Sequence, residues 1–189
     1  APRVLALLAP LALAIGLGSC AYYNTYYLAR KYYDQGTEGK PYLLQKPLAP
    51  NPQPFTKAIE YCKKLITNYP KSKWVDDAYL MWARSLIATE DPRLAIKMLE
   101  EFDDRYPKSP IKGDAAFYLG LAYRNARKHA EAERTLGQFV TQFPKHPLAP
   151  YAYLERARAL MSLDRPEEAA QAAGFVLERY PKSVLADRA

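Results

Sequence analysis

The 189-residue sequence has few of the residues on which chemistry at a protein site usually depends. Two cysteines are too few for a disulfide scaffold, and two histidines leave little for a metal or acid–base site. No glycine-rich phosphate loop, HExxH, CxxC or GxSxG motif occurs in the sequence. The acidic run at residues 100–104 lacks the ligand spacing of an EF-hand loop. We therefore expect a protein that is not an enzyme and that has no metal, no cofactor and no small-molecule substrate.

The charge is moderate, with 27 Lys and Arg residues against 20 Asp and Glu. No Lys/Arg-rich run occurs, so a nucleic-acid partner is not expected. The apolar fraction of 49% excludes intrinsic disorder as the overall class. Proline is abundant, with 16 residues, and tyrosine also reaches 16.

The N-terminal segment has the pattern of a secretory signal. Residues 4–17 are uncharged and apolar, follow Arg3, and are too few to span a bilayer as a helix. Leu17-Gly18-Ser19-Cys20 resembles a bacterial lipobox, which implies cleavage after residue 19 and lipidation of Cys20. By the same resemblance, Ala21 after the cysteine favours the outer membrane. The alternative is an ordinary secretory signal that happens to contain a cysteine.

A 37-residue repeat is the strongest pattern in the chain. Tyr-Pro-Lys-Ser at residues 69–72 recurs at 106–109 and 180–183, and Phe-Pro-Lys-His occupies 143–146. Each proline should end one helix, and Ser109 is a candidate N-cap of the next. Small residues at Gly120 and Ala132 should let two helices approach closely. The repeat column that contains Cys62 is otherwise apolar, which predicts that its thiol is buried. His146 occupies the column that holds serine in the other units, so we expect it to lie at a helix start.

The third unit resembles the tetratricopeptide signature. Leu119-Gly120, Tyr123, Ala132 and Pro144 stand at the separations of that family. The resemblance implies an all-α fold, an α-α superhelix (a tetratricopeptide-like solenoid) of about four helix pairs with a 37-residue period, preceded by a lipoprotein signal.

We expect a signal peptide at residues 1–19 and a repeat domain at 20–189. The units should cover residues of about 22–71, 72–108, 109–145 and 146–182, with the start of a further helix at 183–189. The first unit carries a proline-rich insertion at 36–54, which is either a surface loop or an arm that binds a partner or caps the superhelix. Six tyrosines crowd the first helix, where some should pack and the rest contact a partner or the membrane interface.

In this family the first helix of each pair lines a concave groove, which binds partners. Arg30, Arg84 and Arg158 share one column, so an arginine ladder beside aromatic rings should bind an extended peptide or an acidic chain end. The alternative is that these arginines are only solvated or paired with Asp77 and its equivalents. Charge reversal at Arg84 or Arg158 is expected to weaken partner binding without unfolding the array. Carried over by position, the groove residues are Tyr23, Tyr26, Arg30, Tyr33, Asp77, Leu80, Arg84, Ile87, Asp114, Phe117, Leu121, Arg124, Tyr151, Leu154, Arg158 and Met161.

The run at residues 139–153 resembles the outer-membrane lipoprotein D subunit of the β-barrel assembly machinery (the YfiO family). That resemblance implies a non-catalytic scaffold, lipid-anchored at the periplasmic face of the outer membrane of a Gram-negative envelope. Its partners would be other proteins or extended peptides, including β-barrel assembly subunits, and the membrane through the lipid on Cys20. The alternatives are a coordinator of the Tol–Pal system, or the anchor and binding module of a larger envelope enzyme.

Overall fold

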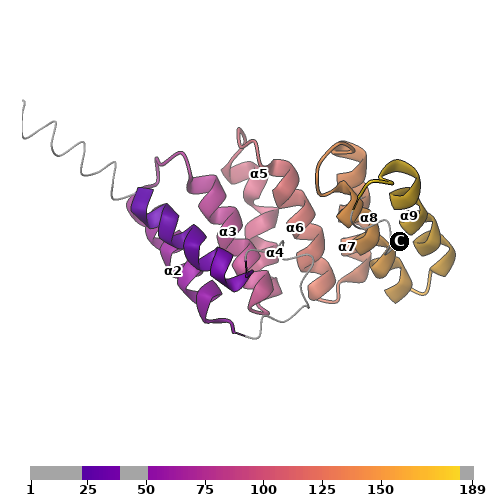
Figure 1. Ribbon diagram of the computed structural model, residues 1–189, viewed down its shortest axis with the longest axis horizontal. Helices are drawn as coiled ribbons and strands as arrows, with labels where there is room; N and C mark the ends of the chain where they lie inside the picture. Colours follow the sequence, from indigo (N-terminus) through magenta and orange to yellow (C-terminus); the bar gives the residue numbers. More distant parts are fainter. Residues whose placement is uncertain (1–22, 39–50, 184–189) are drawn as a thin grey trace, which may run out of the picture.

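The computed structural model describes residues 23–38 and 51–183 of the chain. The expected signal peptide, Cys20, the middle of the proline-rich insertion and residues 184–189 lie outside these ranges. Figure 1 shows antiparallel helices stacked side by side in one elongated array. The described residues form helices and turns without any strand, and none of these helices is long and apolar enough to cross a membrane.

The helices follow one another as pairs, as the repeat predicts. A helix over residues 23–36 precedes the insertion, and we refer to it as helix 23–36. Each later helix packs on its neighbours in the chain. The further elements are α2 (Gln53–Asn68), α3 (Val75–Ala88), α4 (Pro92–Glu100), α5 (Phe102–Arg105), α6 (Lys112–Asn125), α7 (His129–Gln142), α8 (Ala149–Ser162) and α9 (Pro166–Arg179). The predicted all-α superhelix of helix pairs is confirmed.

The turns between pairs are alike because the same backbone hydrogen bond closes each of them. The N–H of the Ser or His residue donates to the carbonyl of the aromatic residue three positions earlier, at 2.9, 3.0, 3.0 and 2.8 Å in chain order. Ser109 is not the N-cap that the sequence suggests, because α6 begins only at Lys112. Its hydroxyl instead accepts from the N–H of Ile111 at 3.3 Å and donates to Asp76 at 2.6 Å. The imidazole of His146 makes the equivalent bond, in which Nδ1 accepts from the N–H of Leu148 at 3.2 Å.

The turns within pairs have a feature that the sequence does not reveal. Glu90, Arg127 and Asp164, which are 37 residues apart, adopt positive φ angles of 62°, 58° and 57°. After each of them, the next N–H bonds back to a carbonyl five residues earlier, as from Lys128 to Tyr123 at 2.9 Å. This is the C-terminal cap that glycine usually provides. None of these three positions is a glycine, so the sequence alone does not predict the caps.

Small residues hold the two helices of a pair together. Ala58, Ala95, Ala132 and Ala169, which form one column of the repeat, are all buried. A Cβ built on Gly120 would lie 2.6 Å from the Leu136 side chain, so glycine is required for this approach. Cys62 is fully buried, as predicted, and burial raises the pKa of its thiol to about 12.

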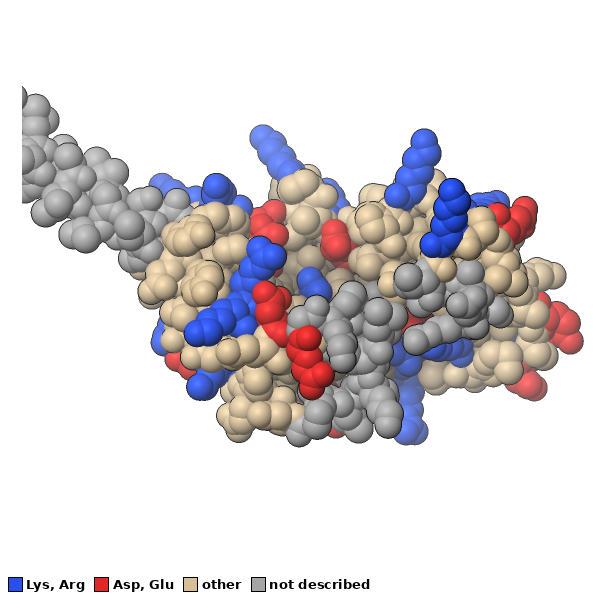
Figure 2. Space-filling model, viewed as in Figure 1, with Lys and Arg blue, Asp and Glu red and all other residues tan. Residues whose placement is uncertain are grey.

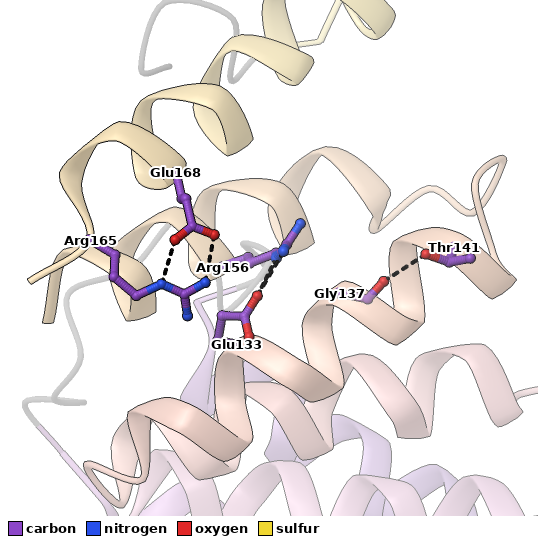
Figure 3. A network of polar contacts seen from close by, with 6 residues as sticks. All are labelled: Glu133, Gly137, Thr141, Arg156, Arg165 and Glu168. Atoms are coloured by element: carbon purple, nitrogen blue, oxygen red, sulfur yellow. Dashed lines mark hydrogen bonds and ion pairs between the residues drawn. The ribbon is translucent and has the colours of Figure 1, made fainter. Parts of the chain in front are cut away.

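Basic and acidic side chains are interspersed over the face drawn in Figure 2. Ion pairs link α6 to α8 and α7 to α8. Figure 3 shows one such link, in which the Arg156 guanidinium on α8 donates to Glu133 on α7 at 2.9 and 2.7 Å. Both side chains are mostly shielded from water, which strengthens a charge-assisted pair. Arg165 and Glu168 make a similar two-bond contact at the start of α9, but in an exposed position.

The boundary of the proline-rich insertion differs slightly from the expected one. Gln53 and Pro54 belong to the first turn of α2 and not to an extended segment. Proline is tolerated there because the first N–H groups of a helix have no partner within the helix.

Five of the six tyrosines expected in the first helix lie within helix 23–36, and three of them pack against α2 or the residues that follow it. Tyr26 stacks on Trp74 at 5.0 Å and Tyr32 on Tyr61 at 5.6 Å, while Tyr33 meets Phe55 edge-on. Tyr23 and Tyr27 remain 58% and 53% exposed.

The two glycines at 120 and 174 should respond in opposite ways to alanine. Gly120→Ala would force a methyl group against buried Leu136, so we expect it to lower the free energy of unfolding by about 1–3 kcal/mol. Gly174 lies in α9 with nothing within 4 Å of an added Cβ, so Gly174→Ala should raise that free energy by about 1 kcal/mol. Urea unfolding of both variants measures the difference, and equal effects would contradict the close approach at Gly120.

Candidate peptide-binding cleft

Helix 23–36, α3 and α6 together border a cleft of about 340 Å³ near the N-terminal end of the array. The cleft brings together seven of the predicted groove residues, which are Tyr26, Arg30, Tyr33, Asp77, Leu80, Arg84 and Asp114. Asp34, Met81 and Ile111 also line it and were not predicted.

Arg84 is the central cation of the cleft and is held by aromatic rings. Its guanidinium lies 4.7 Å from the ring centre of Tyr33 and 4.6 Å from that of Tyr118. These rings come from helix 23–36 and α6, so Arg84 on α3 is stacked between its two neighbours. Its Nε is buried without a hydrogen-bond partner among the described residues. Burial opposes the charge of Arg84, but the neighbouring Tyr118, Tyr33 and Asp114 outweigh it and raise the pKa of the guanidinium.

Carboxylates face this cation across the cleft. Burial is the main cause that raises the pKa of Asp77, and the nearby charges of Asp76 and Asp114 raise it further, while Arg30 lowers it. Burial, and then Asp77, raise the pKa of Tyr26 to about 12. The Tyr26 hydroxyl therefore remains protonated at neutral pH. Burial and the neighbouring carboxylates disfavour the ionised form of Asp77. A cationic group from a partner would stabilise that ionised form.

The cleft thus has the parts of a binding site. Its surface carries two aromatic rings, one stacked guanidinium and two neighbouring carboxylates, from Tyr26, Tyr33, Arg84, Asp77 and Asp114. Among the described residues, no group of three or more His, Cys, Asp or Glu side chains could hold a metal ion. An extended peptide with a basic group and free backbone carbonyls matches these features.

The three arginines of the predicted ladder have different surroundings, and only Arg30 and Arg84 line the cleft. Arg30 is exposed, with its side chain 3.8 Å from Asp34, whereas Arg84 is enclosed by tyrosines. Arg158 pairs with Glu155, a buried carboxylate that also lies 2.5 Å from Arg124. Arg30 and Arg158 are thus paired, with Asp34 and Glu155, but neither partner belongs to the Asp77 column that the alternative named.

Several predicted groove residues belong to the core and cannot contact a partner in this structure. Ile87, Phe117 and Leu121 are at most 1% exposed. Tyr151 is partly buried against the same core. Helix periodicity identifies the face of a helix but not how deeply the next helix covers it, which explains the error.

The remaining predicted residues lie away from the cleft. Leu154, Arg158 and Met161 border a second hollow of about 510 Å³ between α8 and α9. Met161 is 60% exposed there, and the lining is mostly apolar. Tyr23 is exposed beside Trp74, at a ring distance of 5.5 Å.

The stacked position of Arg84 alters the expected effect of reversing its charge. Arg84→Glu should lower the free energy of unfolding by at least about 2 kcal/mol, because a carboxylate replaces a cation between two rings. Arg84→Lys should have an intermediate effect, since an ammonium lacks the flat face of the guanidinium. Arg93→Glu, at an exposed position on α4, is the matched control and should leave stability within about 0.5 kcal/mol. Thermal unfolding of the three variants tests this, and a fully stable Arg84→Glu protein would contradict the stacking.

Solved structures share this fold. A putative kinesin light chain from Podosopora anserina, with nearly identical TPR-like repeats, superposes with a TM-score of 0.64 at 20% identity, covering 86% of this chain and 76% of its own. MamA superposes with a TM-score of 0.63, also at 20% identity, covering 85% of this chain and 74% of its own. No curated protein matches the sequence. The likeness to the solved structures establishes the fold alone.

Family profiles are more informative. A tetratricopeptide-repeat profile matches residues 16–72. The profile described as outer membrane lipoprotein (YfiO) matches residues 81–186, which is more than half of the chain. Families of these kinds are generally protein-interaction modules without catalytic activity. The helical repeats, the cleft and this match together lead to one conclusion: the chain belongs to the YfiO family of outer membrane lipoproteins.

Proposed function

We propose that this protein is a lipid-anchored periplasmic scaffold that binds other proteins during the assembly of outer-membrane β-barrels. The observation that carries the proposal is the match of residues 81–186 to the outer membrane lipoprotein family. The solenoid and its cleft support it, because stacked helix pairs provide an extended surface for peptide segments.

The anchor is part of the same proposal. Residues 1–19 act as the signal peptide, residues 20–189 form the repeat domain, and Cys20 carries the lipid at the periplasmic face of the outer membrane. The lipobox-like residues 17–20 support this assignment. Several acyl chains on one cysteine suffice for stable attachment, since each buried CH₂ contributes about 0.8 kcal/mol.

Removal of the thiol at Cys20 tests the anchor directly. Cys20→Ser should transfer the protein from the membrane fraction to the soluble fraction, or leave it uncleaved with its signal segment. Cys62→Ser is the matched control, because that thiol is buried in α2 and should not affect membrane attachment. Fractionation and intact-mass measurement of both variants give the answer. A lipid-free Cys20 in the wild-type protein would refute the anchor.

The cleft is proposed as the partner site, and its charges suggest how a peptide binds. Asp77 and Asp114 would receive a basic side chain or an amine, while Arg30 and Arg84 would bond backbone carbonyls or a carboxylate. Tyr26 and Tyr33 form aromatic walls for apolar groups between them.

Neutral substitutions in the cleft should weaken partner binding without unfolding the array. We expect Arg30→Gln and Asp77→Asn each to reduce affinity by about fivefold, the equivalent of about 1 kcal/mol. Arg93→Gln and Asp104→Asn make the same chemical changes at exposed positions outside the cleft and should bind normally.

Affinity capture from solubilised envelopes provides the measurement. The wild-type protein should recover β-barrel assembly subunits, and both cleft variants should recover less of them. Recovery of Tol–Pal or cell-wall proteins in their place would overturn the assembly role. Unchanged recovery by both cleft variants would overturn the cleft as the binding site.

A further inference from the structure

The four turns between helix pairs place a row of lysines along one edge of the solenoid. Lys71, Lys108, Lys145 and Lys182 occupy the same position of the repeat, and all four are exposed. The turns themselves, at residues 69–74, 106–111, 143–148 and 180–183, contain a fifth lysine, Lys73, and no acidic residue. Figure 1 shows these turns together at the upper edge, where basic side chains project in Figure 2.

The turn geometry fixes where these lysines point. The aromatic residue before each proline packs inward, as Tyr106 does against Tyr79 at 5.3 Å and Tyr180 against Tyr153 at 6.1 Å. The Pro-Lys pair that follows is exposed in every copy. None of the four repeated lysines forms an ion pair with another described residue. Their charges therefore remain available to a partner.

The opposite edge is different. Its described turns carry Glu90 with Asp91, Arg127 with Lys128, and Asp164 with Arg165, so acidic and basic charges balance. Two acidic side chains near the lysine edge are engaged, since Asp76 accepts from Ser109 and Asp103 lies 4.0 Å from Lys112, while Asp104 and Glu178 are exposed beside its turns. The lysine edge is more basic than the opposite edge because the repeat places one lysine in each of its turns, and not because the whole chain is basic.

The chain enters the array at the lysine edge. Tyr23 and Tyr26, in the first turn of helix 23–36, contact Trp74, which belongs to the first lysine-bearing turn. Lys73 also lies over the Trp74 ring, at 4.7 Å. If Cys20 carries a lipid, only two residues separate it from Tyr23, and the three Cα–Cα steps between them span at most about 11 Å. The anchor would then hold this edge next to the bilayer.

We propose that the lysine edge, defined as Lys71, Lys73, Lys108, Lys145 and Lys182, lies on an anionic phospholipid surface. The inference rests on the proposed lipid anchor, and it adds the orientation of the solenoid to that anchor. Each lysine near an anionic bilayer gains electrostatic attraction, and a row of them acts together. The exposed ring of Tyr23 beside this edge suits the headgroup region, where tyrosine is favourable.

Amine footprinting of the full-length lipidated protein in vesicles tests the orientation. The vesicles are phosphatidylcholine alone or phosphatidylcholine mixed with phosphatidylglycerol, and labelling of each lysine is quantified by mass spectrometry. We expect labelling at the lysine edge to fall by about fivefold on the anionic vesicles, the equivalent of about 1 kcal/mol per lysine. Lys63, Lys97 and Lys128 are exposed away from that edge and are the internal controls.

The two proposals fail in distinguishable ways. Loss of the protein from both kinds of vesicle would refute the anchor, while equal labelling on both would refute the orientation. Protection should also disappear at high salt, because the Debye length falls from about 10 Å at 0.1 M to about 3 Å at 1 M. Protection that appears only after envelope proteins are added would assign the edge to an acidic protein partner and overturn the membrane contact.

Discussion

The hydrogen bond that closes each Tyr/Phe-Pro-Lys-Ser/His turn determines the register of the whole solenoid. It joins the last helix of one pair to the first helix of the next, so its geometry sets how consecutive pairs stack. In each of these turns the Tyr or Phe ring packs inward and the lysine is exposed. The four-residue turn therefore determines both the packing beneath the lysine edge and the charge on its surface. The cleft depends on this register, because its residues come from helices of three successive pairs.

The sequence was sufficient for the architecture and insufficient for the contents of the groove. Columns of small residues at a fixed spacing predict helix pairs, since only close helices require them at Ala58, Ala95 and Ala132. The neighbours of Arg84 could not be predicted in the same way, because Tyr33 and Tyr118 are distant in sequence and meet it only after stacking. The positive φ of Arg127 at the C-terminal cap could not be predicted from the sequence either, since glycine is the residue usually found at such a cap.

The cleft combines a half-buried carboxylate with a cation that is enclosed by two tyrosine rings. The pKa of Asp77 is raised chiefly by burial and then by neighbouring carboxylates, and the buried Nε of Arg84 lacks a partner among the described residues. Perturbed titratable groups are more frequent at functional sites than elsewhere, and this supports the proposal that the cleft is the partner site. The contrast with the Arg156–Glu133 pair is informative, because there both partners are satisfied and only hold two helices together.

The Arg84 stack also bears on how the array folds. Solenoids usually behave as chains of units in which each unit interacts only with its immediate neighbours. Tyr33, Arg84 and Tyr118 belong to the first, second and third units, so one side chain couples the two outer units through the middle one. Fraying of helix 23–36 would expose one face of this cation and weaken the contact with α6. The N-terminal half should therefore unfold as a single cooperative block, while α8 and α9, beyond the reach of the stack, can open separately.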